Sequence, residues 1–460
     1  MKYISTRSSS VKYNFEKIFL KGLADDGGLF TPTTIPVYSE KDLNKFKDLS
    51  YSELAIELIF PFVGDTISKN DLSNIIKNSY KKFDDKNVVK ISNLGNFKLL
   101  ELFHGPTLAF KDIAMQFIGN LYEHYLNQNK KKINIVVATS GDTGSAAIDA
   151  IKGRKNMNVF VLHPDNKISS VQKKLMTTAS EKNVYNLAIQ GNFDDCQNIV
   201  KSLFADKKFS NSINMSGVNS INWARIIAQS VYYFYSYFKV LPFFKNVNFS
   251  VPTGNFGDVF SGYFAKKMGL PINKLIVATN SNDILHRAIT RGDYASNPAI
   301  ETLSPSMDIQ IASNFERLIY DLNQGNSLET KKIMDKFKKE KKYIIPKDHL
   351  SKINLNFLSE SLNEKELISS IRYTYENFKI VLDPHTAIGY GVLNKLNIDS
   401  NTIILATAHP SKFPEAIEKS LNIKTKLPAK LNYIMDQKEK YDKLENNTEA
   451  VKKFILKKLS

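Results

Sequence analysis

The spacing of hydrophobic residues changes near residue 96 and divides the chain into two unlike regions. Before this point, helix-like stretches alternate with polar linkers and are interrupted by a glycine-rich turn at 24–29. After it, short apolar runs typical of buried strands alternate with helical periodicity. The pattern predicts strands at 133–138, 158–162, 247–251, 275–279 and 402–407. Such alternation predicts an α/β fold whose mostly parallel sheets carry helices on both faces.

Composition and periodicity suggest three regions. We place an N-terminal domain at residues 1–95 and an α/β region with two sub-domains at 96–425. Within the α/β region, residues 323–379 are rich in Lys, Glu and Asn, which predicts surface helices or an insertion. Residues 426–460 predict a charged helical tail with few anchors in the core.

The chain is strongly basic, with 63 Lys and Arg against 46 Asp and Glu and a formal net charge of +17 over 460 residues. This excess raises the hypothesis of nucleic-acid binding. The lysines are spread along the whole sequence, however, and no zinc-binding pattern or RNA motif accompanies them. We therefore expect no nucleic-acid partner and keep a basic nucleic-acid-binding protein only as a remote alternative.

The single cysteine, Cys196, excludes an internal disulfide and fits a reducing compartment. The most apolar run, 231–244, is interrupted by Lys239 and Pro242, so it predicts a core helix and not a membrane span. The first residues contain no apolar signal segment. These features predict a cytoplasmic protein with no membrane partner.

A candidate catalytic amine lies at the start of a predicted helix. Lys111 follows a Gly-Pro turn and the apolar run 108–110. A partly buried ammonium loses its preference for the charged form, so the free amine becomes available as a nucleophile or base. A lysine that binds a cofactor as a Schiff base needs this property. An ordinary surface lysine is the alternative, and Lys111 considered alone favours it.

Three polar loops follow predicted strands, where the ligands of open α/β sheets gather. Residues 139–144 and 252–258 combine hydroxyls or glycines with a helix N-terminus, so each suits a carboxylate or phosphate. Thr407 ends a third strand, where a neutral hydroxyl suits a ring nitrogen. A capped helix start, a plain glycine turn and a satisfied buried hydroxyl are the competing interpretations. We interpret His409 as a packed loop histidine.

Asn222 and Arg225 are three residues apart at the start of another predicted helix, so both can face one anion. An ion pair at the helix start is the alternative. Together, an amine, two anion-binding loops and a ring-nitrogen partner indicate a site for pyridoxal 5′-phosphate (PLP).

Six segments in order resemble the successive motifs of the threonine synthase family, in its longer bacterial and fungal branch. They are residues 104–112, 139–144, 220–225, 253–258, 304–309 and 406–410. Residues 3–7 and 25–29 resemble its N-terminal signature, although Ser8 stands where the family usually has glycine. The resemblance implies a fold-type II PLP enzyme, similar to the tryptophan synthase β subunit, with an added N-terminal domain.

The resemblance also implies a role for each matching residue. Lys111 would bind PLP covalently and act as the catalytic base. The other cofactor-binding residues would be Asp142, Gly254, Asn255, Phe256, Gly257 and Thr407. The substrate-binding residues would be Ser140 and Thr143, near the substrate carboxylate, and Asn222 and Arg225, which would hold its phosphate. No metal is expected.

The implied activity is that of a carbon–oxygen lyase acting on phosphate. It would convert O-phospho-L-homoserine and water to L-threonine and phosphate by β,γ-replacement, the last step of threonine biosynthesis. We expect a monomer or a homodimer. The nearest alternative is a phosphohomoserine-degrading PLP lyase of the same fold, which would release 2-oxobutyrate.

Overall fold

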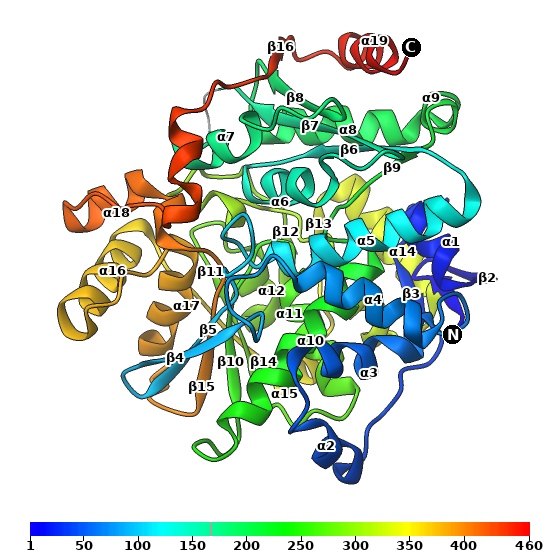
Figure 1. The fold of residues 1–460 in the computed structure, drawn as a ribbon. Helices are drawn as coiled ribbons and strands as arrows, with labels where there is room; N and C mark the ends of the chain where they lie inside the picture. The colour runs from blue at the N-terminus through cyan, green and yellow to red at the C-terminus, as the bar shows by residue number, and fades with distance from the viewer. Residues whose placement is uncertain (166–167) are drawn as a thin grey trace.

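A six-stranded sheet lies at the centre of the computed structural model, which describes residues 1–165 and 168–460 (Figure 1). The strand order is β14-β11-β10-β15-β5-β4, and every neighbouring pair is parallel except β4 with β5. The strands are β4 Lys90–Leu94, β5 Phe97–Glu101, β10 Asn248–Pro252, β11 Leu275–Thr279, β14 Phe357–Ser361 and β15 Thr402–Ala406. The runs predicted at 247–251, 275–279 and 402–407 are therefore confirmed as strands.

A second sheet of five strands has the order β16-β8-β7-β6-β9 and is parallel throughout. Its strands are β6 Ile133–Ala138, β7 Met157–Pro164, β8 Val184–Ile189, β9 Met215–Ser216 and β16 Asp442–Leu444. β6 matches the predicted strand residue for residue, and β7 extends the strand predicted at 158–162. The prediction of a mostly parallel α/β fold is confirmed.

Both sheets are buried on their two faces, as alternating side chains show. In β15, Ile403 and Leu405 pack into the largest core cluster, whereas Ile404 and Ala406 pack into a separate cluster on the opposite face. Helices cover each face, which explains why the strands are apolar along their whole length. The helices are α5 Lys111–Asn129, α6 Asp142–Ile151, α7 Ser170–Thr177, α8 Phe193–Ala205, α9 Lys207–Ser212, α10 Trp223–Val240, α11 Gly257–Lys267, α12 Ile284–Arg291, α13 Phe315–Leu322, α17 Pro384–Lys395 and α18 Pro414–Leu421.

The N-terminal region contains the expected helices and a small sheet that the pattern did not predict. The helices are α1 Phe15–Lys21, α2 Glu40–Phe46, α3 Tyr51–Val63 and α4 Lys69–Tyr80. The antiparallel strands β1 Tyr3–Ser5, β2 Ser8–Tyr13 and β3 Phe30–Pro32 have the order β2-β1-β3. The two outer strands each pair only with β1, and two of the three have three residues, too few for alternation to be visible.

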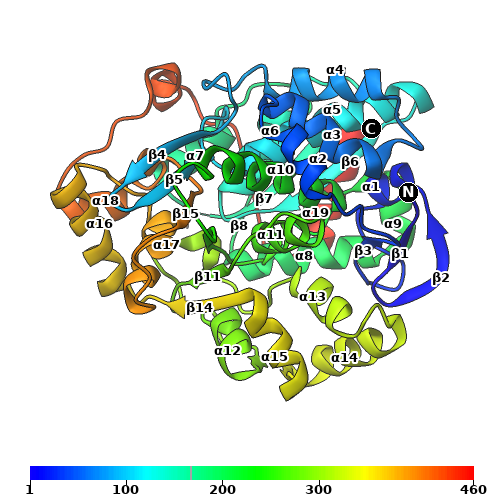
Figure 2. The same ribbon diagram turned by 90° about the horizontal axis from the view of Figure 1, so that it is seen from below.

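The N-terminal region shares its core with the α/β region. Phe62 of α3 packs against Trp223 of α10 and Phe264 of α11, with ring centroids 6.5 and 5.5 Å away. Figure 2 shows α3 and α4 lying beside α10 and α5. The two regions therefore stabilise each other through one continuous apolar interior.

Residues 323–379 contribute to the central sheet, so the prediction of surface helices or an insertion there is wrong for one element. The segment forms α14 Ser327–Glu340, β13 Lys342–Ile344, α15 Lys347–Asn356, β14 and α16 Glu364–Phe378. β14 pairs in parallel with β11 over five residues and forms an edge of the six-stranded sheet. β13 pairs with β12 Asp293–Ala295. The charged flanking helices concealed the strand in the sequence.

The C-terminal tail is helical at its end, as predicted, but it is better anchored than its charge suggested. β16 extends the five-stranded sheet beside β8, and α19 Thr448–Leu459 lies across the same end of the molecule (Figure 1). Val451 and Ile455 of α19 are fully buried in the core cluster that also contains residues of α8. Within the described residues, no helix is both long and apolar enough to cross a membrane.

We predict that Ile455→Ala loosens this tail. The side chain is fully buried, and removing it is expected to cost about 2–5 kcal/mol of local stability. Limited proteolysis or hydrogen exchange of α19 would measure the change. Leu456, the next residue, is 48% exposed, so Leu456→Ala is the matched control and is expected to cost only about 0.5 kcal/mol. Equal effects of the two variants would contradict the anchoring role.

Candidate active site

Lys111 is the first residue of α5 and is held where two strand ends meet. Phe110 N–H donates to the Thr407 carbonyl at 2.8 Å, so the loop before α5 is fixed to the end of β15. Lys111 Nζ lies 3.1 Å from Asp142 Oδ2 and 4.8 Å from the centre of the Phe110 ring. Its side chain is 12% exposed.

Burial lowers the pKa of Lys111, and the positive charges of Lys412 and Arg225 lower it further, while Asp142 acts in the opposite direction. The sequence-based expectation of a partly buried amine is therefore confirmed by the geometry. At a given pH, the neutral fraction of Lys111 is therefore larger than that of an exposed lysine.

Asp142 is a buried carboxylate that several polar groups converge on. It is the first residue of α6, directly after the loop that ends β6. Its Oδ1 accepts from Gln172 Nε2 at 2.9 Å, and its Oδ2 accepts from Ser306 Oγ at 3.3 Å. Burial would raise the pKa of Asp142, but the charges of Lys111 and Lys412 outweigh this effect and hold the pKa well below its usual value. Asp142 is therefore ionised at neutral pH.

Lys412 is the second cation on this carboxylate. Its side chain is fully buried, and Nζ lies 2.8 Å from Asp142 Oδ1. Among the described residues, Asp142 is the only carboxylate within ion-pair distance of the Lys412 ammonium. A buried ammonium is costly unless an opposite charge lies beside it, so the Lys412 side chain depends on Asp142.

The loop between β10 and α11 has no room for larger side chains. A Cβ on Gly254 would lie 2.8 Å from the Ser306 carbonyl oxygen. Phe256 adopts a left-handed backbone with φ of 62°, and it precedes α11 without capping that helix through its side chain. The backbone N–H groups at this helix start are therefore available to an anion such as a phosphate.

Thr407 follows β15, and its backbone is fixed by a buried network. Its N–H donates to Thr386 Oγ1 at 3.2 Å, and the Thr386 hydroxyl in turn donates to Asp383, the residue that caps α17. No described residue bonds the Thr407 hydroxyl. This leaves the hydroxyl available for a ring nitrogen.

Arg225 is buried at the start of α10 without a carboxylate partner among the described residues. Its Nε is buried without a hydrogen-bond partner in this part of the structure, and Nη1 makes only a long contact of 3.4 Å with the Val218 carbonyl. Burial lowers the pKa of Arg225 to about 10, so it stays charged at neutral pH. An unpaired buried guanidinium is suited to a phosphate.

Asn222 lies beside Arg225, but its amide is already engaged. Its Nδ2 donates to the Phe19 carbonyl at 3.1 Å, and its Oδ1 accepts from Ala224 N–H at 3.0 Å and caps α10. These bonds hold the start of α10 against the N-terminal region. A direct contact of Asn222 with a substrate phosphate stays a prediction. Ser140 and Thr143 flank Asp142 at the start of α6 and are half-buried.

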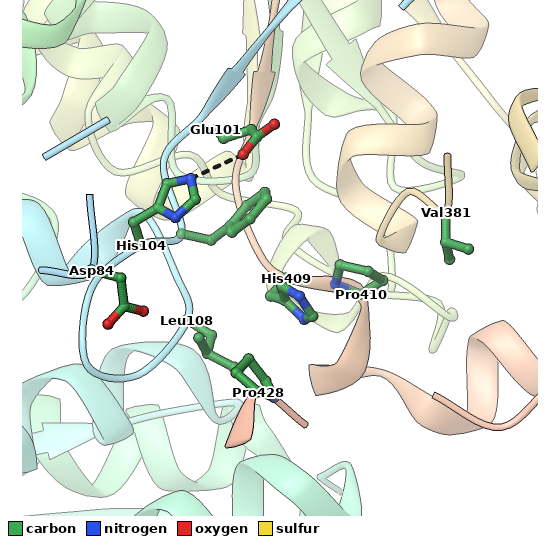
Figure 3. Close-up of a pocket in the computed structure, with 9 residues that line it drawn as sticks. Asp84, Glu101, His104, Leu108, Val381, His409, Pro410 and Pro428 are labelled. Carbon is green, nitrogen blue, oxygen red and sulfur yellow. Dashed lines mark hydrogen bonds and ion pairs between the residues drawn. The ribbon is translucent and has the colours of Figure 1, made fainter. Parts of the chain in front are cut away.

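A cavity of about 380 Å³ adjoins the loop that carries Lys111 (Figure 3). Leu108 and His409 line it, together with His104, whose Nε2 lies 2.9 Å from Glu101 Oε2. His409 Nδ1 contacts Ser411 Oγ at 2.7 Å, and burial lowers the pKa of His409 to about 4. His409 is therefore neutral near pH 7 and packs in the loop, which agrees with the interpretation from sequence.

Known proteins match the whole chain. Family models for the threonine synthase N terminus, for pyridoxal-phosphate dependent enzymes and for the threonine synthase C-terminal part match residues 2–80, 88–346 and 386–455. Threonine synthase from Pseudomonas aeruginosa is 42% identical over 459 residues, which cover 99% of this chain and 98% of that protein. This chain belongs to the threonine synthase family.

Solved structures agree with this assignment. A crystal structure of PLP-bound threonine synthase from Brucella melitensis is similar with a TM-score of 0.95 and 41% identity, over 100% of this chain and 99% of that one. Yeast threonine synthase is similar with a TM-score of 0.93, also at 41% identity, over 100% and 98% of the two chains. The fold is that of a fold-type II PLP enzyme, and PLP is the cofactor of this threonine synthase.

The residues of this site fit PLP. The site offers a buried lysine as an amine and a loop at Gly254 without room for a side chain as an anion cradle. It also offers an unbonded hydroxyl for a ring nitrogen and a buried guanidinium as a second anion partner. They come from the carboxyl ends of strands in both sheets, where the loops after β5, β6, β10 and β15 approach one another.

Sequence reasoning missed two residues of this cluster. Lys412 is one of 63 lysines and arginines, and only its burial distinguishes it. Ser306 lies in the segment 304–309, which resembled a family motif but suggested no chemistry. Its carbonyl packs against Gly254 and its hydroxyl contacts Asp142, so it links the two anion-binding loops.

We predict that Gly254→Ala weakens PLP binding, with a dissociation constant raised roughly tenfold or more, because the new methyl group would push Ser306 and the loop apart. Fluorescence or absorbance titration of the enzyme with PLP measures this. Gly153→Ala is the control: no atom lies within 4 Å of an added Cβ there, although its φ of +76° disfavours a side chain, a strain that Gly254 does not have. The same loss of PLP affinity in both variants would point to general destabilisation instead.

Proposed function

We propose that this threonine synthase converts O-phospho-L-homoserine and water to L-threonine and inorganic phosphate. The observation that carries this proposal is the buried Lys111 amine on Asp142, set beside a glycine loop and the unpaired Arg225. The reaction breaks the bond between Cγ and the phosphate oxygen and one C–H bond at Cβ. It forms a bond between Cβ and the oxygen of water and a new C–H bond at Cγ, and the phosphate leaves as inorganic phosphate. The enzyme is thus a carbon–oxygen lyase that acts on phosphate.

In this proposal Lys111 has two tasks. It holds PLP covalently before the substrate binds, and it then takes the proton from the substrate Cα as a free amine. When bound, PLP withdraws electrons from the substrate and so stabilises negative charge on its carbon atoms. The lowered pKa of Lys111 favours both tasks, because only the neutral amine attacks a carbonyl or accepts a proton.

The remaining residues bind and orient. We assign the PLP phosphate to the backbone of residues 254–257 and the pyridine nitrogen to the Thr407 hydroxyl. Because the hydroxyl is neutral, it can bond the nitrogen without fixing a proton on it. Asp142 would face the cofactor ring, and Ser140 and Thr143 would face the substrate carboxylate.

We assign the substrate phosphate to Arg225. Asn222 is assigned to the same phosphate, and its bonds to Phe19 and Ala224 support a further part in fixing the start of α10. A buried guanidinium distinguishes a phosphorylated substrate from its unphosphorylated analogue, since the analogue would leave the charge unpaired.

A product assay separates this activity from that of a phosphohomoserine-degrading lyase. Full-length enzyme with PLP is incubated with O-phospho-L-homoserine, and threonine, phosphate and 2-oxobutyrate are quantified. We expect threonine and phosphate in equal amounts. Lys111→Ala is expected to lose turnover by a factor of at least about 10³ and to lose the visible absorbance of covalently bound PLP, with its fold intact.

The two arms of this assay test different claims. Phosphate with 2-oxobutyrate and no threonine would identify the degrading lyase. Normal threonine formation by Lys111→Ala would remove Lys111 from its assigned role. Circular dichroism of the variant guards against loss of the fold, because Lys111 is largely buried at a densely packed helix start.

Arg225→Ala is expected to lower kcat/KM for O-phospho-L-homoserine roughly 10- to 100-fold, mainly through a higher KM, because a charged hydrogen bond to the phosphate is lost. Arg372→Ala is the control, since Arg372 is an exposed residue of α16 that bonds the Ser420 carbonyl. An unchanged KM for Arg225→Ala would contradict the assignment.

Four further properties stay proposals. We propose a monomer or homodimer, no nucleic-acid partner and a cytoplasmic location. We also propose the division into residues 1–95, 96–425 and 426–460.

A further inference from the structure

Two lysines share one buried carboxylate in this site. Lys111 Nζ lies 3.1 Å from one oxygen of Asp142, and Lys412 Nζ lies 2.8 Å from the other. Among the described residues, Asp142 is the only carboxylate within ion-pair distance of either lysine. With both amines protonated, the cluster therefore holds two positive charges against one negative charge, in a place with little access to water.

The two lysines differ in exposure, so they have different roles in the cluster. The Lys111 side chain is 12% exposed and Lys412 is fully buried. Lys412 Nζ lies against Asp142 Oδ1 and is shielded from solvent. Its ammonium can therefore act on bound molecules only through Asp142 or through its charge.

We propose that Lys412 is the permanent counter-ion of Asp142 and thereby releases Lys111 to lose its proton. A lone Lys111–Asp142 pair would hold Lys111 as an ammonium, since an opposite charge at about 3 Å favours the charged form of an amine. With Lys412 on the other oxygen, the carboxylate stays neutralised when Lys111 becomes a free amine. Lys412 is thus a positioning residue, and the inference rests on the proposed covalent role of Lys111.

The other charged groups around the cluster do not replace Lys412. Asp112 accepts both the backbone N–H and the hydroxyl of Thr107, and Asp258 accepts the hydroxyl of Thr253. Arg225 adds positive charge and has no carboxylate in ion-pair distance among the described residues. The titratable and charged groups that face the cluster are Lys111 and Asp112 of α5, Asp142 of α6, Arg225 of α10, Asp258 of α11 and His385 of α17.

The test is the pH dependence of covalent PLP attachment to the full-length enzyme. PLP is removed with hydroxylamine and added back between pH 6 and pH 10, and the rate at which the visible absorbance of the attached cofactor appears is recorded. Lys412→Met, which keeps the length of the side chain without its charge, is expected to raise the midpoint of this profile by about one pH unit or more. Attachment below the midpoint would then be roughly tenfold slower.

Two further variants test the direction of the shift in the midpoint, which a merely structural role of Lys412 would not determine. Lys412→Arg keeps the charge and is expected to keep the midpoint near that of the wild type. Asp142→Asn removes the anion that retains the Lys111 proton, so it is expected to move the midpoint downward. These two variants also test the inference if Lys412→Met does not fold.

Lys452→Met is the matched control, because Lys452 pairs with Asp206 and Glu449 far from the site. A Lys412→Met midpoint equal to that of the wild type and of the control would overturn the inference, as would shifts of Lys412→Met and Asp142→Asn in the same direction. Failure of the proposed function is seen separately. In that case the absorbance of attached PLP would be the same in the wild type and in Lys111→Ala.

Discussion

The buried carboxylate of Asp142 is the constraint on which the rest of the site depends. Removing a charge of this kind from water costs several kcal/mol unless opposite charges and donors surround it. Here Lys111, Lys412, Gln172 and Ser306 all converge on it, from α5, η2 Pro410–Lys412, α7 and the loop 304–309. All of these segments contact the same two oxygens. The charge of the carboxylate and the geometry of the site therefore depend on each other.

Backbone contacts between loops complete this arrangement. Phe110 N–H donates to the Thr407 carbonyl, so the segment that carries Lys111 is fixed to the end of β15. The Ser306 carbonyl lies against Gly254, so the segment 304–309 packs on the loop after β10. Parallel strands place such loops at one edge of each sheet. Because the loops support each other, residues as far apart in the chain as Lys111 and Lys412 meet on one carboxylate.

The N-terminal region supports the site without entering it. Arg317, fully buried, donates to the Phe30 carbonyl from the N-terminal sheet and to the Ile221 carbonyl from the segment before Arg225. Its guanidinium also lies 5.3 Å from the centre of the Trp223 ring. Asn222 makes a parallel link to Phe19. The added region therefore fixes the start of α10, which explains physically why this fold includes it.

The sequence by itself determined the α/β class, the five strands β6, β7, β10, β11 and β15 and the six motif segments, because apolar runs and strand-to-helix loops are local features. It did not reveal β14 or β16, which become strands only by pairing with β11 and β8. It indicated Lys111 through its apolar neighbours, but it could not distinguish Lys412 from other lysines or show that Asn222 is engaged by Phe19. Burial and charge pairing arise between residues far apart in the chain. For that reason only the tertiary structure decided which lysines share Asp142 and how deeply each is buried.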